Sequence, residues 1–91
     1  MKRYVIERHI PGIGGLPQEQ IKALAAASNN AIEKLAGKVQ WIHSHLASDQ
    51  TFCVYLAESE ERVREHSRLA GFPITRVHEI VKMIDPTTAH S

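Results

Sequence analysis

The stretch from Val39 to Ala57 constrains the fold of this 91-residue chain more than any other. It contains two segments rich in β-branched and aromatic residues, which meet at a short polar run, Ser48-Asp49-Gln50-Thr51. This pattern is typical of two antiparallel strands joined by a tight turn at residues 48–51. Most side chains that could carry chemistry lie in this hairpin, so the rest of the chain is interpreted as its scaffold.

Before the hairpin, the pattern changes from a strand to a helix. Lys2 to Ile10 alternates and contains Tyr, Val and Ile, which favour a strand, and Pro11 ends it. Apolar residues then recur every three or four positions with alanines between them, which predicts a helix over residues 17–36. Gly37 is a residue type that commonly follows a helix end.

After the hairpin, a helix is followed by a strand. Ser59 is a good N-cap, and Gly71-Phe72-Pro73 is a strong stop signal, so we expect a helix over residues 59–70. Residues 74–84 are rich in Ile and Val and predict a last strand, which Asp85-Pro86 closes.

The element order βαββαβ predicts one ferredoxin-like α+β domain over residues 1–91. In this fold a four-stranded antiparallel sheet carries both helices on one face. The opposite face stays uncovered, and it is partly apolar because several strands are apolar on both sides. We therefore expect a homodimer packed sheet to sheet, a dimeric α/β barrel, with the tail at 85–90 reaching toward the partner.

Charge and cysteine content narrow the function classes. Eleven Lys and Arg nearly balance ten Asp and Glu along the chain, which argues against nucleic acid or an anionic membrane as a partner. No apolar run approaches membrane-spanning length, and the N-terminus lacks a signal-peptide pattern. The single cysteine, Cys53, excludes an internal disulfide. The sequence predicts a soluble cytoplasmic protein.

Six histidines are many for this length, and two of them suggest a metal site. His43 and His45 alternate across Ser44, which puts both on the same face of one strand. Imidazole pairs suit nickel, zinc or copper, and the thiolate of Cys53 would add a soft ligand. A loop symmetric about Asp49-Gln50 would pair His45 with Val54 and point Cys53 away; one extra loop residue would bring Cys53 to the histidine side. The alternative is a pair of partly exposed sheet residues without a metal.

Glu7 and His9 also share a face, on the first strand. His78 or Glu79 of the last strand could neighbour them, since these two strands are adjacent in the ferredoxin-like fold. A carboxylate in a dimer cavity could be a metal ligand or a base with a raised pKa. The alternative for Glu7 is an interface salt bridge with Arg8, with Arg76 or with the partner chain.

Three further features favour structural roles. His66 lies on the buried stripe of its helix, where it is expected to hydrogen-bond a neighbour. Cys53 lies in an apolar strand and can equally be an inert core thiol. Gly12-Ile13-Gly14-Gly15 precedes a helix but lacks the full glycine pattern and the Lys-Ser/Thr of phosphate loops.

Several segments together resemble a known family over Tyr4 to Ala89. It is a small bacterial ferredoxin-like domain family of largely unknown function, some members of which are named nickel-binding proteins. The resemblance implies the ferredoxin-like fold and a dimeric α/β barrel, and it assigns no metal ligand by position. The segments are Tyr4-Val-Ile-Glu-Arg8, Trp41-Ile-His-Ser44, Cys53-Val-Tyr55, Arg64-Glu-His66, Gly71-Phe-Pro73 and Ile84-Asp-Pro-Thr-Thr-Ala89.

The residues and the resemblance lead to one main functional hypothesis. It is a cytoplasmic protein that binds nickel or another divalent transition metal through His43, His45, Cys53, Glu7 and His9. One alternative is a dimeric α/β-barrel enzyme that acts on an unknown small molecule through Glu7, His43 or His66, in a cavity between sheet and helices. Another is an interaction module with no site. A deep cavity with convergent polar groups would favour the enzyme.

Overall fold

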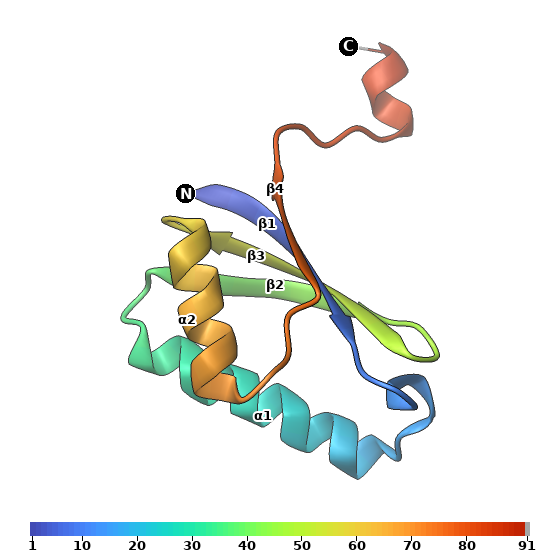
Figure 1. Ribbon diagram of the computed structural model, residues 1–91. Coiled ribbons are helices and arrows are strands. Elements are labelled where there is room, and N and C mark those ends of the chain that lie inside the picture. Colours follow the sequence, from blue (N-terminus) through green and yellow to red (C-terminus); the bar gives the residue numbers. More distant parts are fainter. Residues whose placement is uncertain (91) are drawn as a thin grey trace.

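The computed structural model describes residues 1–90 and has the expected ferredoxin-like fold. Four strands form one antiparallel sheet in the order β2-β3-β1-β4, and both helices lie on one of its faces (Figure 1). No helix within residues 1–90 is long and apolar enough to cross a membrane. The elements in chain order are β1 (Lys2–His9), η1 (Ile13–Gly15), α1 (Gln18–Lys34), β2 (Val39–Leu46), β3 (Gln50–Ala57), α2 (Glu60–Ala70), β4 (Arg76–Ile80) and η2 (Pro86–His90), where η marks a 3₁₀ helix.

The core lies between the sheet and the helices. Alternate residues of β1 and β3 face α1 and α2 and are almost fully buried, among them Tyr4, Ile6 and Tyr55. Val63 of α2 packs against them. Side chains alternate across a strand, so burial of this set leaves the intervening residues on the other face.

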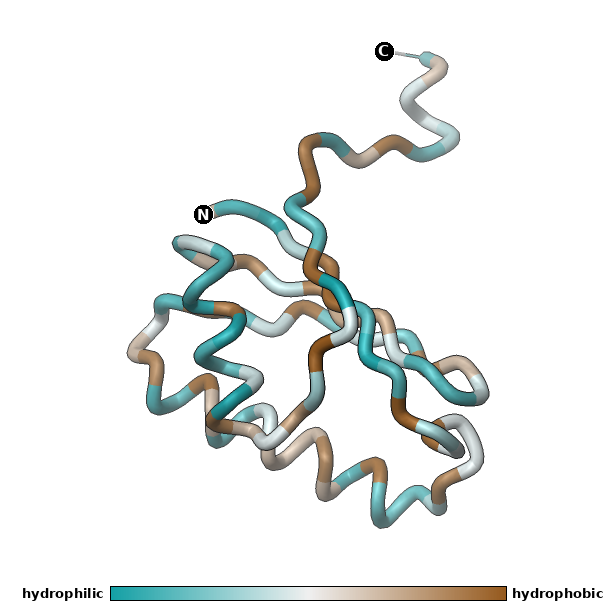
Figure 2. The backbone as a smooth tube through the Cα atoms, viewed as in Figure 1, coloured by the Kyte–Doolittle hydropathy of each residue, from teal (hydrophilic) through white to brown (hydrophobic). Residues whose placement is uncertain are grey.

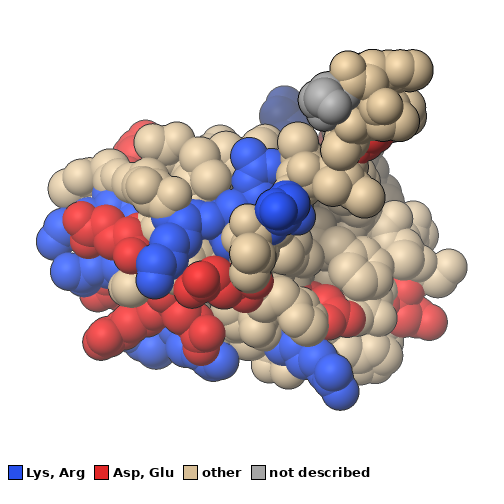
Figure 3. Space-filling model, turned by 90° about the horizontal axis from the view of Figure 1, so that it is seen from above, with Lys and Arg blue, Asp and Glu red and all other residues tan. Residues whose placement is uncertain are grey.

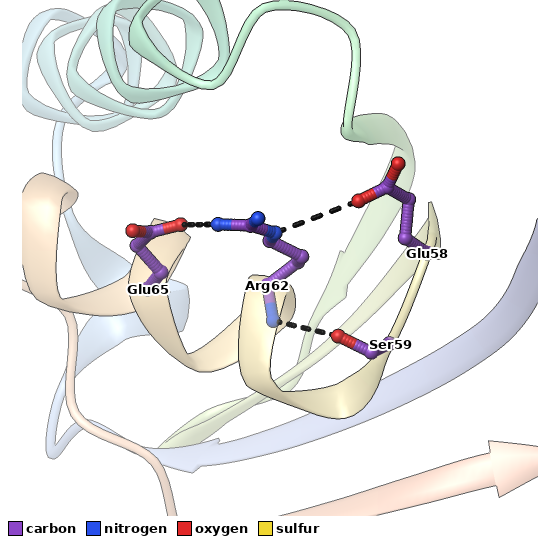
Figure 4. A network of polar contacts seen from close by, with 4 residues as sticks. All are labelled: Glu58, Ser59, Arg62 and Glu65. Atoms are coloured by element: carbon purple, nitrogen blue, oxygen red, sulfur yellow. Dashed lines mark hydrogen bonds and ion pairs between the residues drawn. The ribbon is translucent and has the colours of Figure 1, made fainter.

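The helix α2 has the predicted caps at both ends. The backbone N–H of Arg62 donates to Oγ of Ser59 at 3.4 Å, and Gly71 adopts the left-handed conformation with φ of 78°. The Arg62 guanidinium lies between two carboxylates, 3.5 Å from Glu58 and 3.0 Å from Glu65 (Figure 4). These contacts fix where α2 begins against the end of β3.

The central hairpin has a shorter loop than the sequence suggests. Ala47 N–H donates to the carbonyl of Gln50 at 2.8 Å, and Leu46 pairs with Thr51. Only two residues, 48 and 49, therefore form the loop, and the predicted turn over 48–51 is wrong by two residues. Two-residue loops suit the twist of paired strands, which allows β3 to start earlier.

The glycine-rich segment after β1 holds the tip of this hairpin. Gly12 N–H donates to Oδ1 of Asp49 at 2.8 Å, and Gly14 N–H donates to the carbonyl of Ser48 at 3.0 Å. Gly12 has a φ of 78°, which favours glycine. These N–H groups hydrogen-bond to the hairpin and attach η1 to the β2–β3 loop. We call this pair of contacts the clip.

The last strand is shorter than predicted, because β4 ends at Ile80 and not at residue 84. Ile80 pairs with Arg3, and β1 begins at Lys2. Residues after Ile80 therefore have almost no β1 residues to pair with. Residues 81–90, which we call the C-terminal arm, project away from the domain (Figure 1). The first part of the arm alternates between hydrophobic and hydrophilic residues (Figure 2), and the apolar residues Val81, Met83 and Ile84 are 90%, 67% and 72% exposed.

Candidate functional site

The uncovered side of the sheet gathers most of the chemically interesting residues, and we call it the open face. Its centre is apolar, and its two edges carry imidazole and carboxylate groups. Two cross-strand rows define it in the ladder: His43–Val54–Val5–His78 and His45–Phe52–Glu7–Arg76.

His43 and His45 lie together on this face, at the β2 edge. Their ring centroids are 4.9 Å apart, and the rings are inclined at 74° to each other. Both side chains are exposed. The spacing across Ser44 predicted a shared face, and the ladder has this arrangement.

A β-bulge at Ile42 sets the direction of the two histidines. Trp41 pairs with Tyr55 and His43 pairs with Val54, so Ile42 has no partner in the ladder. In an uninterrupted strand Trp41 would share a face with His43. The bulge lets Trp41 pack against the core while His43 stays on the open face.

Glu7 is the centre of a second polar group, at the β1–β4 edge. Nε2 of His78 lies 2.6 Å from Oε2 of Glu7, and Nε2 of Gln50 donates to Oε1 at 3.1 Å. The hydrogen bond from His78 is the main cause that lowers the pKa of Glu7, and Arg76 adds to it. The expected neighbour on the last strand is therefore His78. A base with a raised pKa was expected only inside a dimer cavity; in the single chain the surroundings of Glu7 favour the carboxylate.

His9 shares the open face with Glu7, opposite Gln50 at the end of β1, and its side chain is exposed. Across residues 1–90, however, no group of three or more His, Cys, Asp or Glu side chains is close enough to hold a metal ion. The described part of the chain thus presents separate pairs of donors and no complete ligand set.

Cys53 lies on the opposite face from the histidines. It pairs with Ser44, is buried, and its Sγ is 3.5 Å from Oγ1 of Thr51. The ladder pairs His45 with Phe52, a register that neither alternative for the loop anticipated, although the symmetric one correctly pointed Cys53 away. Cys53 therefore does not join His43 and His45 in a ligand set within this chain.

His66 is a fully buried core residue, as expected from its helical stripe. Its Nε2 lies 3.2 Å from Oγ and 3.4 Å from the carbonyl oxygen of Ser28. Burial is the main cause that lowers the pKa of His66 to about 4. The imidazole is neutral at pH 7 and joins α2 to α1.

Arg8 differs most from its expected position, because it is buried in the core and was expected to pair with Glu7. Its side chain is 1% exposed and points to the helices, away from Glu7 on the other face, so the suggested salt bridge between them is wrong. The alternation Tyr4, Ile6, Arg8 already indicated the core face, but a charged residue there runs against the usual burial preference.

Charges elsewhere on the surface are mixed in sign. On the side seen in Figure 3, Lys and Arg are interspersed with Asp and Glu, and the projecting arm is mostly uncharged. This side therefore has no extended field of one sign.

Comparison with known proteins identifies the family. The sequence model described as "Nickel responsive protein SCO4226-like" matches residues 4–80. This chain belongs to the SCO4226-like family. The match ends where β4 ends, and the C-terminal arm lies outside it. No curated protein matches the chain.

A solved structure supports the fold. The crystal structure of SCO4226 from Streptomyces coelicolor A3(2) resembles this chain with a TM-score of 0.76 at 16% sequence identity. The likeness covers 90% of this chain and 99% of that chain. At this identity the likeness shows the shared fold, and the ligands have to be argued from this chain's own residues.

Proposed function

We propose that this protein binds nickel, or a divalent ion of similar chemistry, on the open face of its sheet, and that it does so as a homodimer. The observation that carries the proposal is the pair His43 and His45, with ring centroids 4.9 Å apart on one exposed strand face. The family's description as nickel responsive favours nickel among the ions that imidazole suits.

The two rings are close enough to share an ion. A coordinating imidazole nitrogen lies about 2.0–2.1 Å from a metal such as zinc, and the observed ring separation is compatible with two such bonds to one ion. Nickel accepts nitrogen and oxygen donors in square or octahedral sets. Two histidines leave positions to fill, and Glu7, His9 and His78 carry donors of the right kind.

A second copy would supply the missing donors. Within one copy β3 separates β2 from β1, and no group of three or more His, Cys, Asp or Glu side chains within residues 1–90 is close enough to hold an ion. In a two-fold dimer packed through the open faces, the histidine pair of one copy can face the Glu7–His78 pair of the other. This explains why one chain holds only pairs of donors.

Two apolar features support the dimer. The centre of the open face is formed by Val5, Phe52 and Val54, and Phe52 is among the exposed large hydrophobic residues. The C-terminal arm exposes Val81 and Ile84 as well. Apolar surface of this kind is usually covered by a partner.

The arm also has internal order at its tip. The backbone N–H of Thr87 donates to Oδ1 of Asp85 at 2.9 Å, and the Asp85 N–H donates to Oγ1 of Thr88 at 3.0 Å. A structured turn that follows the exposed apolar residues of the arm is consistent with a segment that docks on a second copy. We place the dimer in the cytoplasm, where the buried thiol of Cys53 stays reduced.

The test is a calorimetric titration of metal-stripped protein with Ni²⁺ and, separately, Zn²⁺. The parent should bind Ni²⁺, and the His43→Ala/His45→Ala variant should lose at least about a hundredfold in affinity, because both proposed imidazole ligands are gone. Glu33→Ala, which removes an exposed carboxylate of α1 on the helix side of the sheet, is the control and should bind like the parent. Equal affinity of the parent and the double variant would overturn the assignment.

Acid should weaken the binding. Imidazole coordinates only when it is unprotonated, so the Ni²⁺ affinity should fall as the pH drops below about 6. The same titration at pH 7.5 and pH 5.5 measures this effect. An unchanged affinity would mean that histidines are not the ligands.

A further inference from the structure

The side of the sheet that faces the helices borders a small, half-open cavity, separate from the open face. Its volume is about 100 Å³. Apolar side chains form most of its wall, among them Ile21 and Leu24 of α1, Trp41 of β2 and Phe72 after α2. Arg8 of β1 also lines it.

Arg8 is buried without a negative partner. Its Nη1 donates to Oγ of Ser67 at 3.0 Å and to the carbonyl of Pro73 at 2.7 Å, and its Nη2 donates to the Tyr55 hydroxyl at 3.2 Å. All three acceptors are neutral. Among residues 1–90 no carboxylate forms an ion pair with Arg8. The positive charge is therefore held in an apolar pocket with neutral acceptors only.

The guanidinium of Arg8 also has N–H donors that make no hydrogen bond. A guanidinium has five N–H donors, and three hydrogen bonds engage Nη1 twice and Nη2 once. Nε is buried and has no partner. Nε and Nη2 lie on the same edge of the guanidinium. In proteins this edge commonly donates two parallel hydrogen bonds to a carboxylate.

Burying a charge is costly unless an opposite charge accompanies it, and a buried N–H donor without an acceptor is rare in native proteins. The Phe72 ring, whose centroid is 5.2 Å from Cζ of Arg8, offers the cation only a weak interaction. A bound anion would supply the missing opposite charge.

We propose that this cavity binds a small monocarboxylate with a short apolar chain. The carboxylate pairs with the guanidinium charge of Arg8, which lines the cavity, and the apolar chain packs against Ile21, Leu24 and Trp41. A cavity of 150 Å³ holds benzene, so about 100 Å³ suits a ligand of roughly four to six non-hydrogen atoms. This inference is independent of metal binding, because the open face and the cavity lie on opposite sides of the sheet.

The experiment titrates the full-length protein with sodium butyrate and, in parallel, with butyramide, which has a similar shape without the charge. Trp41 is the single tryptophan of the chain and lines the cavity, so its fluorescence reports occupancy. Butyrate should give a saturable change in emission, and butyramide should bind at least about tenfold more weakly, since it cannot neutralise Arg8.

Two variants locate the site. Arg8→Gln should lower butyrate affinity by about tenfold or more and should bring it close to that of butyramide. Ala25→Leu leaves Arg8 in place and fills the cavity that Ala25 lines, so it should abolish the fluorescence change even if Arg8→Gln fails to fold. Circular dichroism confirms that each variant is folded.

Three results would overturn the proposal. They are the absence of a saturable response to butyrate, equal affinity for butyrate and butyramide, and a butyrate affinity that Ala25→Leu leaves unchanged. The first would mean that neutral acceptors alone stabilise Arg8, the second that the pocket takes neutral molecules, and the third that butyrate binds elsewhere.

Discussion

At the scale of single residues, strand alternation predicted which side chains share a face, and it failed where the backbone departs from a regular strand. The shared faces of His43 with His45 and of Glu7 with His9 follow from a period of two. The separation of Trp41 from His43 depends on the bulge at Ile42, and an extra residue in a strand leaves no clear mark in the sequence.

His66 should make stability depend on pH. Its pKa is about 4 in the folded protein and 6.5 in the unfolded chain, so the unfolded state binds the proton first as the pH falls. The stability is fully present above pH 6.5 and is lost toward pH 4. Each pKa unit is worth about 1.4 kcal/mol, which gives a loss on the order of 3 kcal/mol.

Urea denaturation of the parent and of His66→Gln at pH 7 and pH 4 measures this contribution. The variant is expected to be less stable at pH 7, and its stability should fall less on acidification than that of the parent. The pKa of Glu7 is also lowered, so its contribution to stability is lost on acidification as well. This loss is the same in the parent and the variant, and it cancels in the comparison. Parallel losses in the two proteins would show that His66 does not titrate as described.

At the scale of elements, caps and stop signals predicted the two helices to within two residues, whereas the ends of the strands depended on their neighbours. The last strand could not be bounded from residues 74–84 alone, because its length is set by where β1 begins. The hairpin loop was likewise misjudged, since the polar residues Gln50 and Thr51 pair in the ladder despite their turn-like composition.

The clip between η1 and the hairpin predicts a sharp contrast between two neighbouring glycines. A Cβ at Gly14 would lie 2.4 Å from the carbonyl oxygen of Ala47, whereas a Cβ at Gly15 would meet no atom within 4 Å. Gly14→Ala should lower the free energy of unfolding by about 1–3 kcal/mol, because the backbone of η1 or of the hairpin must move.

Gly15→Ala is the matched control and should change the stability by less than about 0.5 kcal/mol. Chemical denaturation of both variants gives the comparison. Equal free energies of unfolding would show that the backbone at the clip adjusts to the added Cβ without loss of stability.

At the scale of the whole molecule, the order of elements was sufficient to predict the fold, and the family match and the solved structure agree with it. The partner and the metal could not be reached in the same way. In the proposed dimer both depend on how two open faces meet, and a single chain's pattern does not encode the angle between two copies.

The C-terminal arm should strengthen the proposed dimer. In a two-fold dimer, Val81→Ser/Ile84→Ser removes four apolar side chains, each worth about 1–2 kcal/mol when buried. The dissociation constant should therefore rise by at least about a hundredfold. Lys82→Ser, at the neighbouring position, is the control and should have little effect. Analytical ultracentrifugation over a range of concentrations measures the change, and a dimer of undiminished strength in the double variant would show that the arm lies elsewhere.

The central claim is that a transition metal binds between two open faces through His43 and His45. Native mass spectrometry of metal-stripped protein, with and without added Ni²⁺, tests it most directly because it reads the oligomer and the metal content of the same particle. We predict a species of twice the chain mass that carries nickel in the parent, and a species that carries none in His43→Ala/His45→Ala. A nickel-loaded monomer, or a double variant that retains the parent's nickel, would contradict this account.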